Sequence, residues 1–138
     1  MFCTEAEFYG GSPEEKGGLK SNDKENVLKA TRERKTRNYT NNFLKNMKES
    51  INDYNKFVII ASDSDNYEQN DYFLKLDMEV LALSGLNFKE NVVLDNRNKD
   101  DIANVLKNSS LIFLSGGDTL QQNIFFNEIS IFLTFLLF

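Results

Sequence analysis

Three short apolar runs with polar boundaries recur in the second half of this sequence. They are FVIIAS at Phe57–Ser62, NVVLD at Asn91–Asp95 and SLIFLS at Ser110–Ser115. Short, continuously apolar runs of this kind are typical of strands that are buried on both faces of a parallel sheet. We therefore expect three parallel strands at these positions.

Segments with helical spacing of apolar residues separate these runs. Apolar residues recur every three or four positions from Tyr67 to Leu83, and Gly85 suits the end of such a helix. Residues 98–109 carry acidic side chains at their start and a lysine near their end, which favours a second helix. A third helix is expected over Thr119–Glu128. The alternation predicts a βαβαβ core over residues 56–128, with helices flanking a mainly parallel sheet.

The N-terminal part of the chain has a different pattern. Residues 1–22 hold four of the seven glycines and the only proline, which predicts an irregular arm with room for a short strand at its start, MFCTEAEF. Residues 23–52 turn helical, but their polar middle fits one long helix or two shorter ones equally well. With 138 residues, the chain can form a single domain with a modest core.

The last ten residues, ISIFLTFLLF at 129–138, contain no charge and no turn signal. A membrane span needs about 20 apolar residues, so a tail anchor is disfavoured. The remaining interpretations are a buried element whose partner is missing and out-of-frame translation, and both amount to a truncation. We therefore expect a three-layer α/β sandwich that is incomplete at the C-terminus, with uncovered apolar surface that promotes association.

The composition narrows the chemistry that this chain can perform. It contains no His, which removes the commonest general base and metal ligand, and its single Cys3 excludes a disulfide framework. The net charge is −5, and the basic cluster Arg32–Arg37 is short and lacks interleaved aromatic residues. No N-terminal signal peptide is visible. We expect a cytoplasmic protein without a cofactor or metal that binds neither nucleic acid nor membranes.

Two acidic pairs are explained better by local structure than by metal binding. Asp63 and Asp65 have the spacing of calcium ligands, but the central Gly and terminal Glu of a calcium loop are absent. A turn at the end of a strand is the expected role of this pair. Asp100 and Asp101 are expected to begin a helix.

The stretch SGGDTLQQ at Ser115–Gln122 is the candidate functional site. Glycines after a buried strand let the backbone turn sharply and bring N–H groups to the edge of a parallel sheet where ligands bind. Such donors can hold a phosphate, or the oxyanion of an acyl-transfer intermediate. The alternative is a tight turn from strand to helix, in which Asp118 is the N-cap.

The segment LIFLSGGDTLQQ resembles the Gly-Gly-Asn-Thr-Phe-Gln segment of the dipeptidase E and cyanophycinase family of serine peptidases. Gly116, Gly117, Thr119 and Gln121 match in register, and Asp118 stands for the usual Asn. The order of expected elements upstream is also similar. The resemblance implies a class I glutamine amidotransferase-like α/β fold and a site for small peptides, typically with Asp at the cleaved bond.

The resemblance also indicates what this chain lacks. The nucleophile of the family is a Ser in a Gly-x-Ser-Ala-Gly turn, followed later by a His, and this sequence contains neither. No residue is therefore assigned a catalytic role, while an oxyanion- and substrate-binding role is implied for Gly116, Gly117, Asp118, Thr119 and Gln121.

We expect an inactive fragment of a serine-type peptidase, a hydrolase whose full-length relatives act on small peptides. One alternative is a non-catalytic α/β binding module. The other is a nucleotide-binding kinase-like domain that uses the GGDT sequence, although this sequence lacks the glycine between acid and Thr in the kinase Gly-Gly-Asp-Gly-Thr loop. The oligomeric state is left open.

Overall fold

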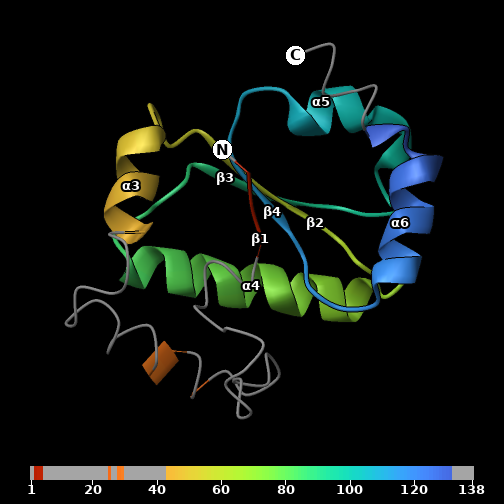
Figure 1. The fold of residues 1–138 in the computed structure, drawn as a ribbon, viewed down its shortest axis with the longest axis horizontal. Coiled ribbons are helices and arrows are strands. Elements are labelled where there is room, and N and C mark those ends of the chain that lie inside the picture. Colours follow the sequence, from red (N-terminus) through yellow and green to blue (C-terminus); the bar gives the residue numbers. More distant parts are fainter. Residues whose placement is uncertain (1, 5–24, 26–27, 30–42, 132–138) are drawn as a thin grey trace.

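The computed structural model describes residues 2–4, 25, 28–29 and 43–131. Its four strands are all parallel and form one open sheet in the order β1-β4-β2-β3. The strands are β1 (Phe2–Thr4), β2 (Lys56–Ile60), β3 (Glu90–Leu94) and β4 (Ser109–Leu114), as Figure 1 shows. The three strands expected in the second half are confirmed.

Within residues 43–131, the α-helices beside the sheet are α3 (Phe43–Ser50), α4 (Tyr67–Leu83), α5 (Ile102–Leu106) and α6 (Thr119–Glu128). The bounds of α4 and α6 agree with those expected from the sequence. The helix expected over residues 98–109 is shorter, because a 3₁₀ turn, η2 (Lys99–Asp101), precedes five α-helical residues. Asp100 and Asp101 do lie at the start of this helical segment, as expected.

The N-terminal expectations are tested only in part. Residues 2–4, expected within an irregular arm, form a strand that pairs in parallel with Ile112–Leu114 of β4. The rest of the arm and most of residues 23–42 lie outside the described residues. Within the expected helical region 23–52, helical conformation is found at Glu25, at Leu28–Lys29 and throughout α3.

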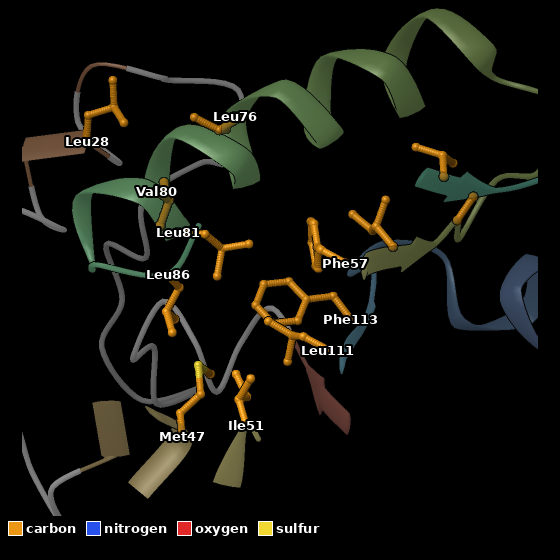
Figure 2. Packing of buried hydrophobic residues seen from close by; sticks show 13 residues of the cluster. Leu28, Met47, Ile51, Phe57, Leu76, Val80, Leu81, Leu86, Leu111 and Phe113 are labelled. Carbon is orange, nitrogen blue, oxygen red and sulfur yellow. The ribbon is translucent and has the colours of Figure 1, made fainter. Parts of the chain in front are cut away.

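Successive side chains of β2 point to opposite faces of the sheet, and both faces are covered by helices. Phe57 and Ile59 belong to one core, with α3 and α4, whereas Val58 and Ile60 belong to a second core, with α5 and α6. This period of two explains why β2 is apolar at every position after Lys56. The α4-side core gathers around Phe57 and Phe113 (Figure 2), and consists of Leu28, Met47, Ile51, Phe57, Ile59, Ala61, Leu76, Val80, Leu81, Leu86, Val93, Leu111 and Phe113.

The second core, which we call the α6-side core, reaches into the C-terminal apolar segment. It consists of Val58, Ile60, Leu94, Leu106, Ile112, Phe125, Ile129 and Ile131. Only 1% of the surface of Ile131 is exposed. Ile129 and Ile131, the described apolar residues of the segment 129–138, therefore pack into the domain. Residues 132–138 lie outside the described part of the chain.

Helix α4 ends at Leu83, and Gly85 directly follows its C-cap, Ser84, as the sequence predicts. Gly85 has a φ of +81°, in the left-handed region that glycine adopts without strain. The amide of Leu86 donates to the carbonyl of Leu81 at 2.8 Å, and the amide of Gly85 to that of Ala82 at 3.0 Å, which is the Schellman arrangement. Since Leu81 and Leu86 are both buried in the α4-side core, this helix end also directs the chain toward β3.

The strand order creates a divergence at the ends of β2 and β4. The chain leaves β2 through α4 on one face, and it leaves β4 through α6 on the opposite face. In open α/β sheets, ligands bind in the crevice at the carboxyl ends of the strands, where the connections diverge in this way. Figure 1 shows these two strand ends meeting between the first turns of α4 and α6. We call this side of the sheet the carboxyl edge.

Candidate functional site

The glycine loop, residues 115–118, begins at the end of β4 and is held firmly at its base. The amide of Ser115 donates to the carbonyl of Ile60 at 3.0 Å, which ties the loop to β2. From the first turns of α6, the side chain of Gln122 donates to the carbonyl of Ser115 at 2.8 Å. Ser115 is buried, whereas Gly116 and Gly117 are exposed. The two glycines therefore form the solvent-facing tip of a fixed turn.

Gly117 lies directly against the loop that follows β2. Its φ is +141°, and a side chain at this position would place Cβ only 2.6 Å from the hydroxyl oxygen of Ser62. A glycine is thus required at position 117 for two reasons: the backbone conformation and the close approach of Ser62. The contact brings the loops after β2 and β4 together at the carboxyl edge.

We expect Gly117→Ala to destabilise the fold by about 1–3 kcal/mol, because it adds both backbone strain and a steric overlap with Ser62. Combining it with Ser62→Gly should restore only part of the loss, since the second change removes the overlap and leaves the strain. Urea unfolding of the two single variants and the double variant measures both contributions. Equal free energies of unfolding for Gly117→Ala and the double variant would show that the overlap contributes nothing.

Asp118 is the N-cap of α6. Its Oδ1 accepts hydrogen bonds from the amides of Leu120, at 2.8 Å, and Gln121, at 3.2 Å. The expected alternative, a tight turn capped by Asp118, is therefore confirmed as the local structure. Because a carboxylate already occupies the positive end of α6, this end has less to offer an added anion.

The five residues that the sequence analysis singled out, Gly116 to Thr119 and Gln121, come together in the glycine loop and the first turn of α6. All five are exposed. Their roles differ, however, since Asp118 is engaged in capping. The hydrogen bonds among the described residues leave the amide of Gly117 without an acceptor, so it can donate to a ligand.

The loop after β2 is the turn that was expected at Asp63 and Asp65. The amide of Asp65 donates to Oδ1 of Asp63 at 3.2 Å, and Asn66 then caps α4 by accepting from the amide of Gln69 at 3.4 Å. Asp63 therefore stabilises its own turn. Among the residues that the structure describes, no group of three or more His, Cys, Asp or Glu side chains could hold a metal ion.

A network at the end of β3 was not found from the sequence. The carboxylate of Asp95 is fully buried and accepts from Nε and Nη2 of Arg97, the shortest contact being 2.7 Å. Arg97 also binds Asp71 of α4 through both terminal nitrogens and lies over the ring of Tyr67. The hydrogen bonds to Asp95, and to a smaller extent those to Asp71, raise the pKa of Arg97. The hydrogen bonds from Arg97 in turn lower the pKa of Asp71.

The loops after β2 and β3 are joined through Asn70 of α4. Its Nδ2 donates to the carbonyl of Asp63 at 3.0 Å and to Oδ2 of Asp95 at 3.2 Å. A second link runs from the amide of Asn96 to the carbonyl of Ser64, at 3.1 Å. The polar sequence DNRN at the end of the second apolar run was the available signal, but it does not indicate which residues these side chains contact.

The described part of the carboxyl edge has an excess of negative charge. Asp63, Asp65 and Asp118 lie in its loops, whereas Arg97 is engaged by two carboxylates and Lys99 pairs with Glu128. This distribution favours neutral or cationic ligands over anions.

Comparisons with known proteins give no relative from which a function could be transferred. The chain has no match among protein-family models and no significant match among curated proteins or solved structures. In the described ranges, no helix has the length and apolar character needed to cross a membrane. The geometry of the carboxyl edge is therefore the basis for a functional hypothesis.

Proposed function

We propose that this chain is a catalytically silent relative of the dipeptidase E-like serine peptidases, with their class I glutamine amidotransferase-like fold, and that it binds short peptides at the glycine loop. The observation that carries the proposal is the position of Gly116 and Gly117 at the divergence of β2 and β4, with the amide of Gly117 available as a donor. Such an amide can donate to a peptide carbonyl, as half of an oxyanion hole does.

Hydrolysis is not part of the proposal, because the chain lacks the groups that would activate a nucleophile. It contains no His and no Gly-x-Ser-x-Gly sequence. A serine hydroxyl needs an adjacent base to attack a peptide bond, and removing members of the triad lowers the rate by several powers of ten. The proposed role of the glycine loop is therefore to bind a peptide without cleaving it.

The charge of the carboxyl edge bears on which ligand is bound. The resemblance implies Asp-containing peptides, but Asp63, Asp65 and Asp118 would repel an acidic side chain. The same charges, together with the filled N-terminus of α6, disfavour the nucleotide-binding alternative. We therefore propose that peptides with neutral or basic side chains bind better than acidic ones.

The test is a titration of the ¹⁵N-labelled chain with Asp-Leu, Ala-Leu and Lys-Leu dipeptides, followed by the amide resonances of Gly116, Gly117 and Thr119. Saturable shifts at these positions with Ala-Leu or Lys-Leu at millimolar concentration, and no cleavage of any dipeptide, are expected. Ile124→Ala, on the exposed side of α6, should leave binding unchanged, whereas Gly117→Ala should weaken it.

Two outcomes would contradict the proposal. Shifts at the glycine loop with Mg-ATP and with none of the dipeptides would favour the nucleotide-binding alternative. The absence of shifts with all of these ligands would favour a binding module whose partner does not use the glycine loop.

A further inference from the structure

We infer that Asn70 is a positioning residue, which sets the position of the loop after β2 relative to the glycine loop. This inference deepens the proposed peptide site and rests on it for its effect on binding. Asn70 lies in the first turn of α4, and only 7% of its surface is exposed. It touches no part of the glycine loop by hydrogen bonding, so it acts through other residues.

The two hydrogen bonds of Asn70 join a fixed point to a loop. Oδ2 of Asp95 is the fixed point, because Arg97 holds this buried carboxylate from Nε and Nη2. The carbonyl of Asp63 belongs to the loop after β2, and the residue before it is Ser62. Each N–H of the carboxamide can serve one of these acceptors, so that the side chain uses its full donor capacity.

The position of Ser62 decides how closely the two loops approach. A Cβ on Gly117 would lie 2.6 Å from the Ser62 hydroxyl, so a small displacement of the turn at Asp63 changes the space at the glycine tip. Asn70, Ser115 and Ala61 border a gap in the packing that is too small for a water molecule. Asn70 holds the turn at Asp63, whereas Asn96 holds it further along, at Ser64 and Asp65.

Asn98 provides a matched control on the same strand end. Its Nδ2 donates to the carbonyl of Val93 at 2.8 Å, and its Oδ1 accepts from the amide of Asp95 at 3.1 Å. It also makes two hydrogen bonds beside Asp95, but neither reaches the loop after β2. A general loss of stability at the end of β3 should affect Asn70→Leu and Asn98→Leu alike, whereas a positioning role belongs to Asn70 alone.

The experiment compares these two variants and Asn70→Gln in the full chain, by the amide resonances of Ser62 and Gly117 and by the affinity for the Ala-Leu dipeptide. Asn70→Leu should shift both resonances and weaken binding by about tenfold, the effect of losing roughly one hydrogen bond. Asn98→Leu should leave the resonances and the affinity unchanged despite a lower urea midpoint. Asn70→Gln keeps the carboxamide. Its Ser62 and Gly117 resonances and its dipeptide affinity should therefore lie between those of Asn70→Leu and the unaltered chain.

Unchanged Ser62 and Gly117 resonances in Asn70→Leu, or equal shifts in Asn98→Leu, would overturn the inference. If Asn70→Leu does not fold, unshifted resonances together with lost binding in Asn70→Gln would overturn it as well. Failure of the proposed function gives a different result: the resonances would still move in the Asn70 variants, although the unaltered chain binds no dipeptide.

Discussion

Arg97→Met should destabilise the fold by about 3 kcal/mol, because it leaves the buried carboxylate of Asp95 without its cationic partner. Asp95 has no exposed surface, and its remaining donors are the side chain of Asn70 and the backbone amide of Arg97 itself. We place the loss at the lower end of the range for buried pairs, since 40% of the Arg97 side chain is exposed and water can replace part of it.

Urea unfolding of Arg97→Met, Asp95→Asn and the double variant measures this effect. The double variant should be more stable than Arg97→Met alone, because it contains no unpaired buried charge. A double variant that is as unstable as the sum of the single variants would show that the two side chains do not interact energetically.

The stabilisation that Arg97 provides through Asp71 should decrease as the pH falls. Arg97 lowers the pKa of Asp71 in the folded state, so at acidic pH the unfolded chain binds more protons than the folded one. The stabilisation is present above the unfolded pKa, about 3.9, and is lost as the pH falls through the lower folded value. The difference in the free energy of unfolding between the unaltered chain and Arg97→Met should therefore become smaller below about pH 4. A constant difference between pH 6 and pH 3 would contradict this assignment.

Phe113→Ala should lower the free energy of unfolding by about 3–5 kcal/mol, the largest effect of any single change considered. Phe113 is fully buried in β4 and meets the ring of Phe57 edge to face, with ring centroids 5.0 Å apart. Replacing it with Ala leaves a cavity in the α4-side core, between the sheet and α4. Since a domain of this size has a total stability of about 5–15 kcal/mol, the variant should be marginally folded at best.

Leu120→Ala is the matched control for this prediction. Leu120 is also a large apolar residue, but 67% of its surface is exposed. Its removal should change the stability by no more than about 0.5 kcal/mol, as is usual for surface positions. Thermal unfolding followed by circular dichroism gives both values. Similar losses for the two variants would mean that Phe113 is not at the centre of the core.

The sequence was sufficient for the elements whose signals are local. The bounds of α6 follow from the Asp118 cap, and the end of α4 follows from Gly85, because in each case one residue satisfies the terminal backbone groups. The shortness of α5 was not predictable in the same way. It ends where Lys107 becomes extended and Asn108 adopts a φ of +60°, and no glycine or proline marks this point.

The location of the candidate site could be predicted from the sequence, but the contacts that hold its loops together could not. Glycines after a buried strand indicate a loop at the carboxyl edge, and both glycines are found there. The contact between Gly117 and Ser62, however, depends on the register of β2 against β4. The joining of Asp63 to Asp95 by Asn70 depends further on the rotation of α4 about its axis. Such contacts between distant segments leave no periodic signal in a single sequence.

The pairing of β1 with β4 has a consequence for the order of events during folding. Phe2 is paired with Ile112, so this part of the sheet joins the first residues of the chain to some of the last described ones. The segment from β2 to β4, by contrast, contains its own parallel pairs and both connecting helices. Closing the longest loop costs the most chain entropy, and this cost precedes the stabilising contacts that the closure allows. During synthesis, β1 therefore leaves the ribosome well before its neighbour β4, and we expect it to pair after β2, β3 and β4 have paired with one another.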